Sequence, residues 1–200
     1  MGKAMRLFSI LLVVITASSG CASTSEVQPE SVVASPSCPS LPVSVGAFAM
    51  YERRKLEAPA RGDAFGFTDG STDRATVFLY PLQDRPAADR AQDMVETEGA
   101  AWVAAFPIGV ERGWYDAYEV AFADPKPIVL ADRTIPGFAG GVPTRKDGSI
   151  SVEVLYLFAV DGCMLKARGS LEGGHWMDSL FPKFAQDLAV AVATQEPPSE

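Results

Sequence analysis

The residues from Ser151 to Gly169, SVEVLYLFAVDGCMLKARG, show the clearest hydrophobic pattern of the chain, and it predicts a β-hairpin. Up to Val160 every second residue is apolar, and most of the residues between them are apolar too. Asp161-Gly162 follows, and Asp-Gly favours a two-residue turn because both central residues of a type I′ turn need positive φ. A strand that is apolar on both faces lies inside a sheet with structure packed on each side. We therefore expect a single sheet built around this hairpin.

Further strands are expected where apolar residues alternate between turn signals. They span residues 45–56, 63–68, 74–80, 114–123 and 128–130. The stretch 134–148 is rich in glycine and proline, so it predicts a loop or an irregular edge hairpin.

Two helices are expected, one after the third strand and one at the C-terminus. Pro86 begins the first, where its missing N–H costs nothing, and Pro107 or Gly109 ends or kinks it. After Gly173-Gly174, the helical spacing of the apolar residues predicts a closing helix of about 18 residues. Because Pro182 would fall in its first turns, the helix is expected to start near Ser179. Its apolar stripe consists of Met177, Leu180, Phe181, Phe184, Leu188 and Val192. The predicted fold class is α+β, a single mostly antiparallel sheet with a helix after the third strand and a C-terminal helix packed on it.

This order of elements resembles the PsbP-like α/β sandwich family. The first strands before a helix carry the resemblance, together with the run LYLFAVDGCMLKARGS and the final helix after it. The resemblance implies a protein that binds a partner or assists assembly rather than an enzyme. It assigns no site residue.

The first 20 residues have the pattern of an export signal. Lys3 and Arg6 precede the apolar run LFSILLVVI, which at nine residues is too short to span a bilayer. Small residues then lead to Cys21, and this resembles the lipobox of bacterial lipoproteins, although Ser18 stands where that family usually has leucine.

The lipobox resemblance implies removal of residues 1–20 and acylation of Cys21. The acyl chains would anchor the protein in a membrane. In Gram-negative lipoproteins an aspartate after the cysteine tends to retain the protein in the inner membrane. Ala22 stands there in this sequence, so the resemblance implies the outer membrane, facing the periplasm, if the source is Gram-negative. The alternative is an ordinary cleaved signal in which Cys21 has no role.

The rest of the chain divides by composition into a tether, a domain and a tail. Serine, proline, threonine and glutamate dominate residues 22–44, so with Cys21 the segment 21–44 predicts a disordered tether. Residues 45–193 form the α+β domain, and residues 194–200 a disordered tail.

The two remaining cysteines, Cys38 and Cys163, are an even pair in an oxidising compartment if Cys21 is acylated. We therefore predict a disulfide between them. The alternative is two independent thiols, with Cys163 a small apolar core residue.

Charge and composition exclude several classes of function. The net charge of −8 argues against nucleic acid and against docking on anionic lipid through a basic patch. One histidine and two paired cysteines cannot make a usual zinc site, so no metal or cofactor is expected. Neither a nucleophile elbow nor a phosphate-binding glycine motif occurs in the sequence.

Four residues are candidates for binding. Lys166 and Arg168 share one face of the second hairpin strand, where they either bind an anion or an acidic partner or form a solvated or ion-paired face. His175 and Trp176 precede the last helix. His175 is either a base or a helix-start residue, and Trp176 would then cap the core.

The sequence favours a non-enzymatic envelope lipoprotein that binds a protein or assists assembly. The alternatives are an envelope hydrolase that uses His175 with a nearby carboxylate, and a carrier of a small apolar ligand. A hydrolase needs a deep pocket with a perturbed carboxylate, a carrier needs a dry cavity, and a binding module needs an exposed patch.

Overall fold

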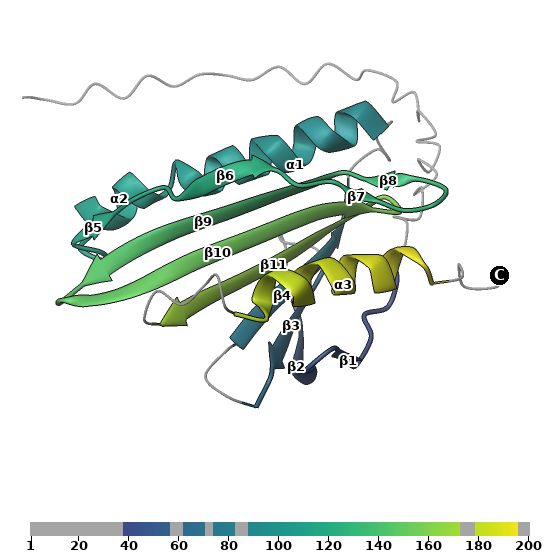
Figure 1. Ribbon diagram of the computed structural model, residues 1–200, viewed down its shortest axis with the longest axis horizontal. Coiled ribbons are helices and arrows are strands. Elements are labelled where there is room, and N and C mark those ends of the chain that lie inside the picture. The colour runs from purple at the N-terminus through teal and green to yellow at the C-terminus, as the bar shows by residue number, and fades with distance from the viewer. Residues whose placement is uncertain (1–37, 57–61, 71–73, 83–87, 173–178, 196–200) are drawn as a thin grey trace, which may run out of the picture. The chain divides into compact units, whose positions relative to one another are not determined.

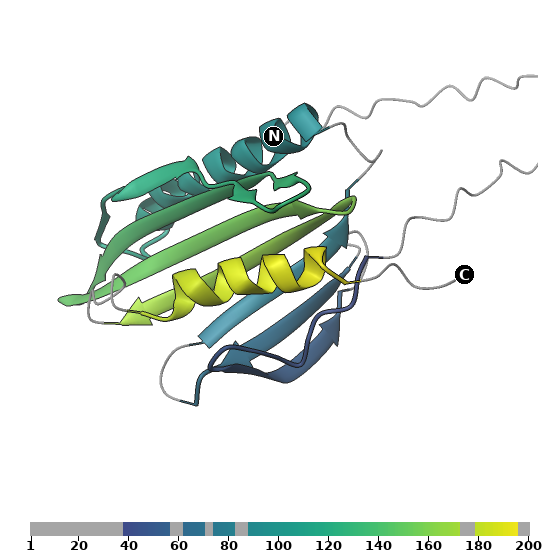
Figure 2. The ribbon, with the colours of Figure 1, turned by 45° about the vertical axis from the view of Figure 1, so that its right-hand side comes forward.

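The computed structural model describes residues 38–56, 62–70, 74–82, 88–172 and 179–195. All of them belong to one compact unit, Ser35–Glu200. The fold class is α+β, as predicted, with a large antiparallel sheet and helices on its opposite faces (Figures 1 and 2).

The nine-stranded sheet has the order β1-β2-β3-β4-β11-β10-β9-β5, and β6 also pairs with β9. Every strand pairing in it is antiparallel. The strands are β1 Ser44–Val45, β2 Phe48–Lys55, β3 Asp63–Thr68, β4 Arg74–Pro81, β5 Ala117–Tyr118, β6 Phe122–Pro125, β9 Gly137–Lys146, β10 Ser149–Val160 and β11 Cys163–Glu172. A separate ribbon pairs β7 Ile128–Val129 with β8 Thr134–Ile135, and the helices are α1 Ala88–Val103, α2 Phe106–Glu111 and α3 Phe181–Ala193.

The predicted central hairpin is confirmed as β10 and β11, with Val160 paired to Cys163. Asp161 and Gly162 have φ of 49° and 80°, the positive values that a type I′ turn requires. Both faces of β10 are buried, because α1 covers one and α3 the other (Figure 2).

The two faces of the sheet carry separate hydrophobic clusters. On the α1 side, Leu155 and Leu157 of β10 pack with Phe138, Met164 and Val95. On the α3 side, the ring of Phe184 lies 4.4 Å from that of Phe48 and 5.2 Å from that of Phe67, between ring centroids. Strand β10 contributes five buried side chains to the cluster on the α3 side: Val152, Val154, Tyr156, Phe158 and Val160.

Helix α3 is shorter than expected. It has 13 residues and begins at Phe181, with Pro182 in its first turn. A proline lacks the N–H that an interior helical position needs, so the helix starts there rather than running through it. Leu180 precedes the helix and is exposed, while Met177 lies outside the described residues.

The helical region after β4 breaks in two before Pro107. Helix α1 ends at Val103, and α2 begins at Phe106 with Pro107 at the start of its first turn. The predicted break is thus present, although Pro107 opens a new helix instead of bending the old one. Pro86 lies outside the described residues. None of the helices in the described ranges is long and apolar enough to cross a membrane.

Two predicted strands are each divided in the structure. Residues 45–56 form the β1–β2 hairpin, because Gly46 has a φ of 57° and turns the chain between Val45 and Phe48. Residues 114–123 form β5 and the start of β6, which continues through Pro125. Proline is tolerated there because β6 is an edge strand, where a missing ladder N–H costs little.

The prediction of a loop or an irregular edge hairpin at residues 134–148 is wrong. Most of this stretch is β9, a ten-residue strand that pairs with β10 along its whole length. Its glycines leave room for neighbouring rings: a Cβ on Gly140 would lie 2.7 Å from Trp102, and one on Gly141 would lie 2.2 Å from Phe122. These glycines therefore indicate that aromatic rings pack closely against the strand, and they do not mark a turn.

Candidate functional site

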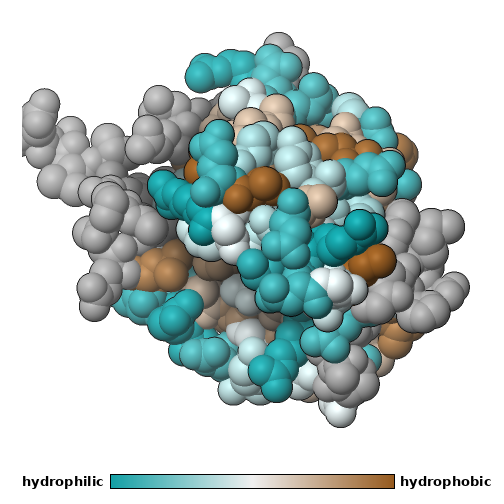
Figure 3. All heavy atoms as spheres, turned by 90° about the vertical axis from the view of Figure 1, so that its left-hand side faces the viewer, coloured by the Kyte–Doolittle hydropathy of each residue, from teal (hydrophilic) through white to brown (hydrophobic). Residues whose placement is uncertain are grey.

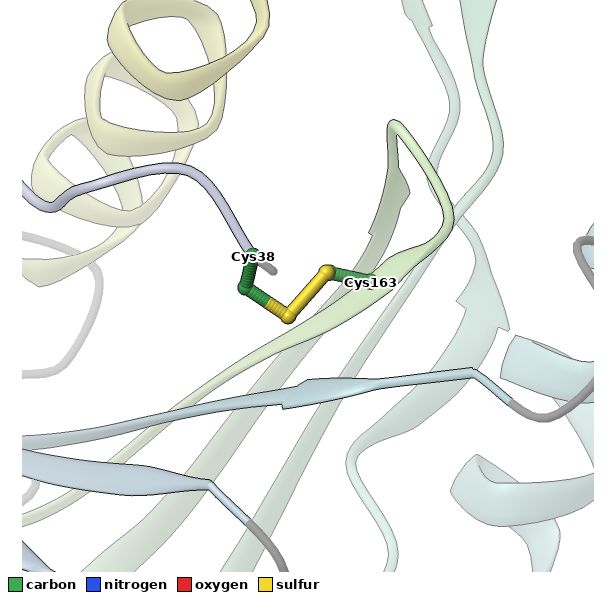
Figure 4. The surroundings of a disulfide bond; sticks show 2 residues. All are labelled: Cys38 and Cys163. Atoms are coloured by element: carbon green, nitrogen blue, oxygen red, sulfur yellow. A yellow bond between two sulfur atoms is a disulfide. The ribbon is translucent and has the colours of Figure 1, made fainter. Parts of the chain in front are cut away.

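The predicted disulfide between Cys38 and Cys163 is confirmed, with a Cα–Cα distance of 5.8 Å. Cys163 is fully buried at the start of β11, directly after the hairpin turn, and Cys38 lies in the segment before β1 (Figure 4). The bond therefore fastens the N-terminal end of the described chain to the central hairpin.

A salt bridge near the Cys38–Cys163 disulfide joins three parts of the chain. Arg133 pairs with Asp161 in the hairpin turn at 2.6 Å and also donates to the carbonyl of Ala193 at the end of α3. The raised pKa of Arg133 follows first from its hydrogen bond to Asp161. Together with the disulfide, these contacts fix this end of the domain, which we call the disulfide end.

Lys166 is held in an ion pair. Its ammonium nitrogen lies 2.7 Å from a carboxylate oxygen of Glu98 on α1, and both side chains are largely buried. The hydroxyl of Tyr80 donates to the same carboxylate at 2.6 Å, and burial followed by this hydrogen bond raises the pKa of Tyr80. Lys166 thus connects α1 to the sheet, which corresponds to the ion-paired alternative for this residue.

Arg168 is exposed two residues further along β11, on the same face. Close to it, Glu153 accepts a hydrogen bond of 2.9 Å from the hydroxyl of Ser170. Burial raises the pKa of Glu153, and the hydrogen bond from Ser170 and the charge of Arg168 oppose that rise. Burial, then the charge of Glu153, raises the pKa of Tyr115 as well. Arg168, Glu153, Ser170 and Tyr115 thus form a small polar cluster beside α2.

Three predicted site residues lie outside the described residues: Cys21, His175 and Trp176. Within the described ranges, no group of three histidine, cysteine, aspartate or glutamate side chains is placed to hold a metal ion.

A shallow hollow of about 450 Å³ lies between α1 and β6. Its lining is mostly apolar, and it opens widely to solvent. The residues around it are Glu96, Ala100, Val103, Ala104, Ala123, Pro125 and Phe138.

Five of the nine exposed large hydrophobic side chains among the described residues lie toward the end of the domain opposite the disulfide, where α2, β5 and the β9–β10 turn lie (Figure 1). We call this the aromatic end, and it is defined by Ile108, Trp114, Tyr118, Val120 and Ile150. The other four are Val43, Tyr51, Val129 and Leu180. Trp114 is 58% exposed and Ile150 48%. In Figure 3, which views the molecule from this side, hydrophobic side chains stand among hydrophilic ones.

The aromatic end rests on a cluster of packed aromatic rings. The ring of Phe106 packs edge-on against Trp102 at 5.0 Å and stacks with Tyr115 and Tyr118 at 5.8 Å each. Gly113, with a φ of 69°, then reverses the chain, and the guanidinium of Arg112 lies 5.2 Å above the ring of Trp114.

The sequence pattern does not indicate the aromatic end. It predicts one strand over residues 114–123, which would bury alternate aromatic residues. The available signal was Gly113 after a short apolar helix, since a glycine in the left-handed region there turns the chain and exposes the next residue.

No family model and no curated protein matches this chain. Among solved structures it is similar to the solution structure of cyanobacterial PsbP (CyanoP) from Synechocystis sp. PCC 6803, with a TM-score of 0.47 and 11% identity over 76% of this chain and 96% of that chain. It is also similar to protein PA94 of unknown function from Pseudomonas aeruginosa, with a TM-score of 0.32 and 11% identity over 76% of this chain and 84% of that chain.

The first of these structures bears the name of the family that the order of elements resembles. At TM-scores below 0.5, neither similarity places the chain in a family or gives it a function. Membership of the PsbP-like family therefore stays a prediction.

Proposed function

We propose that the chain is an exported lipoprotein, anchored in a membrane of the cell envelope through acylated Cys21. Its α+β domain is non-enzymatic and serves as a protein-binding or assembly module. In a Gram-negative source the membrane is the outer one, and the domain faces the periplasm.

The observation that carries the proposal is the disulfide. Disulfides persist in oxidising compartments such as the periplasm and are rare in the cytosol. Pairing of Cys38 with Cys163 also leaves Cys21 as the single cysteine outside a disulfide. That cysteine follows an apolar run and small residues, which is where a lipoprotein carries its acylated residue.

A binding role is supported by the surface of the domain. The hollow beside α1 opens widely to solvent, which disfavours this hollow as a site that must desolvate reacting groups. Exposed aromatic and aliphatic side chains concentrated at one end are typical of a protein contact surface.

The test is the intact mass of the protein extracted from membranes after its free thiols are alkylated without reduction. We expect a chain that begins at Cys21, carries acyl groups and has no alkyl label. The matched control is Cys21→Ala, which should lose the acyl mass and leave the membrane fraction while keeping the disulfide.

Three results would contradict the proposal. A soluble chain that retains residues 1–20, or one that carries alkyl groups on two or three cysteines, rules out the anchor or the oxidising compartment. A chain cut elsewhere and without acyl groups reduces the N-terminus to an ordinary export signal.

A further inference from the structure

We propose that the open edge of strand β2, residues 51–55, binds an acidic, extended segment of another protein, which joins the nine-stranded sheet as a further strand. The inference rests on the binding role in the proposed function and deepens it, because it names the surface that binds and the chemistry of the partner.

Strand β2 has a neighbouring strand on only one side over most of its length. Strand β1 pairs with Phe48 and Ala49 alone, and one further hydrogen bond runs from the N–H of Met50 to the carbonyl of Val43. Beyond Met50, β3 is the only strand of the described chain that lies beside β2 (Figure 1). The open edge is therefore about 17 Å long at the rise of an extended strand.

The pairing of β2 with β3 shows which backbone groups point outward from the open edge. The N–H of Leu56 donates to the carbonyl of Gly62, so the backbone groups of Leu56 face β3. In an antiparallel pair this orientation alternates along the strand. Arg54 therefore faces β3 as well, whereas the N–H and C=O groups of Arg53 and Lys55 point away from it. No hydrogen bond joins these outward groups to any described residue, so they are free to pair with an added strand.

The charges along the open edge select an acidic partner. Three consecutive cations, Arg53, Arg54 and Lys55, are exposed. Arg53 pairs with Asp63 at 2.9 Å, but Arg54 and Lys55 have no ion pair with any described residue. Glu52 is the one acidic side chain of the edge itself, and it too is exposed and has no partner within the described ranges.

The elements around the open edge leave this balance unchanged. On α3, the single lysine and the single aspartate pair with each other. Residues 38–43, which precede β1, carry no charge. The edge thus has two unpaired cations against one unpaired anion, on a chain whose net charge is −8. Opposite charge on the partner is favoured there.

The cations also define where the acidic residues of the partner should lie. The guanidinium of Arg53 lies 5.5 Å from the centre of the ring of Phe65, which belongs to the cluster on the α3 side. Lys55 shares that side of the sheet by alternation, and Arg54 lies on the other side. An added strand would thus meet a cation on each of its faces, and opposite charges across two strands stabilise their pairing. We expect acidic residues opposite Arg54 and Lys55, and a neutral or basic one opposite Glu52.

A second copy of the chain fits the open edge poorly. Two β2 strands that paired through Arg53 and Lys55 would place cations of one copy directly opposite cations of the other, which is destabilising. The register shift between Met50 and Glu52 adds a bulge, and bulges and charges are how natural proteins keep edge strands from pairing with themselves. The occupant is therefore a different chain of opposite charge.

The first test places a photo-crosslinking phenylalanine analogue at Tyr51 of the full-length protein in the cells that produce it. Tyr51 is 56% exposed at the start of the open edge. The control carries the same analogue at Val129 of β7, which is 78% exposed and lies outside the nine-stranded sheet. We expect an adduct with a different protein from position 51 only. Mass spectrometry should map the cross-link to an acidic segment of that protein.

Binding is then measured with the purified partner from the adduct. Lys55→Pro removes an outward N–H, which an edge strand tolerates, and it should raise the Kd about tenfold or more. Lys55→Gln removes the same charge but keeps the N–H, so it should raise the Kd less. The double variant Arg54→Gln/Lys55→Gln should slow association and weaken its dependence on salt. Lys183→Gln removes an exposed cation of α3 and should leave the Kd unchanged. Thermal melting shows whether each variant remains folded.

Amide hydrogen exchange distinguishes strand addition from an attraction between side chains alone. Binding of the partner should slow exchange at the outward N–H groups of Arg53 and Lys55 by about tenfold or more, because an added strand forms hydrogen bonds with them. Exchange at Arg54, whose N–H already faces β3, should change less.

Other outcomes overturn the inference. An adduct of twice the chain mass identifies a second copy, a cross-link to residues 22–37 identifies the chain's own N-terminal segment, and a phospholipid adduct identifies a membrane. Equal or absent adducts at both positions mean that the charges only keep the edge from pairing. An unchanged Kd in Arg54→Gln/Lys55→Gln, or unchanged exchange at Arg53 and Lys55, excludes an acidic added strand. The mass measurement on Cys21 is independent, so failure of the anchor and failure of this edge are distinguishable.

Discussion

Opening the Cys38–Cys163 disulfide should lower the free energy of unfolding by about 4 to 5 kcal/mol. The bond joins residues 125 positions apart, so it closes a long loop in the unfolded chain. In the chain-entropy model such a loop lowers the conformational entropy of the unfolded ensemble by about 16.5 cal/mol/K, which is about 4.9 kcal/mol at 25 °C. A loss of this size is a large part of the 5–15 kcal/mol that stabilises a typical domain.

This loss of stability is measured by urea unfolding, with and without a reductant, of a form of the protein that lacks residues 1–21. The reduced protein should unfold at a lower urea concentration and with a larger m-value, because its unfolded state is less compact. Cys38→Ala/Cys163→Ala separates the cross-link from the packing of sulfur, and it should be slightly less stable than the reduced wild type because Cys163 is fully buried. A loss below about 1 kcal/mol on reduction would refute the loop argument, since it would mean that other contacts already order the unfolded chain.

Three further variants test the packing and electrostatics of the sheet. Gly137→Ala should cost about 1–3 kcal/mol in urea unfolding, because its Cβ would lie 2.3 Å from the backbone carbonyl oxygen of Lys126 and push β6 off β9. Glu98→Gln should cost about 1–3 kcal/mol, because it leaves the largely buried ammonium of Lys166 without a counter-charge. For Glu153, the pKa raised in the folded state means that folding binds a proton; stability is highest below the unfolded pKa and falls as pH rises through the folded pKa. Glu153→Gln should therefore abolish this decrease of stability with rising pH. At a pH above the folded-state pKa of Glu153, the variant should be more stable than the wild type.

Each variant has a matched control. Gly141→Ala meets the ring of Phe122 rather than backbone, so a rotation of that side chain should make it milder than Gly137→Ala. Asp187→Asn breaks an exposed pair with Lys183 and should change stability little. Glu172→Gln alters an exposed carboxylate and should leave the pH dependence intact. Equal effects in a variant and its control would contradict the reason given for that variant.

The elements that the sequence predicted well are those whose local pattern and tertiary role agree. In β10 and β11, alternation, an Asp-Gly turn and burial on both faces all indicate the same hairpin. In α3, Phe181, Phe184, Leu188 and Val192 are buried as their spacing predicts.

Prediction failed where a residue type has two physical uses. Glycine marks a turn at Gly46, but in β9 the glycines make room for the rings of Trp102 and Phe122, which come from other elements. No local pattern contains that information. The exposure of Trp114 likewise depends on the turn at Gly113 and on the support from Phe106, so the aromatic end emerged only from the fold.

Strand β4 is made early but can pair with β11 only late in synthesis. The paired residues of β4 and β11 lie between 82 and 94 positions apart in the sequence (163 − 81 and 169 − 75). On that side, β4 therefore has no neighbouring strand until the ribosome has made nearly the whole domain. Folds dominated by such distant contacts form slowly, because the chain must close long loops before those contacts stabilise it. A nascent chain that ends before β11 leaves Phe48 and Phe67 without the helix that covers them. On the export route proposed above, this delay would keep the chain unfolded until it has crossed the membrane, because the sheet cannot be completed before β11 is made.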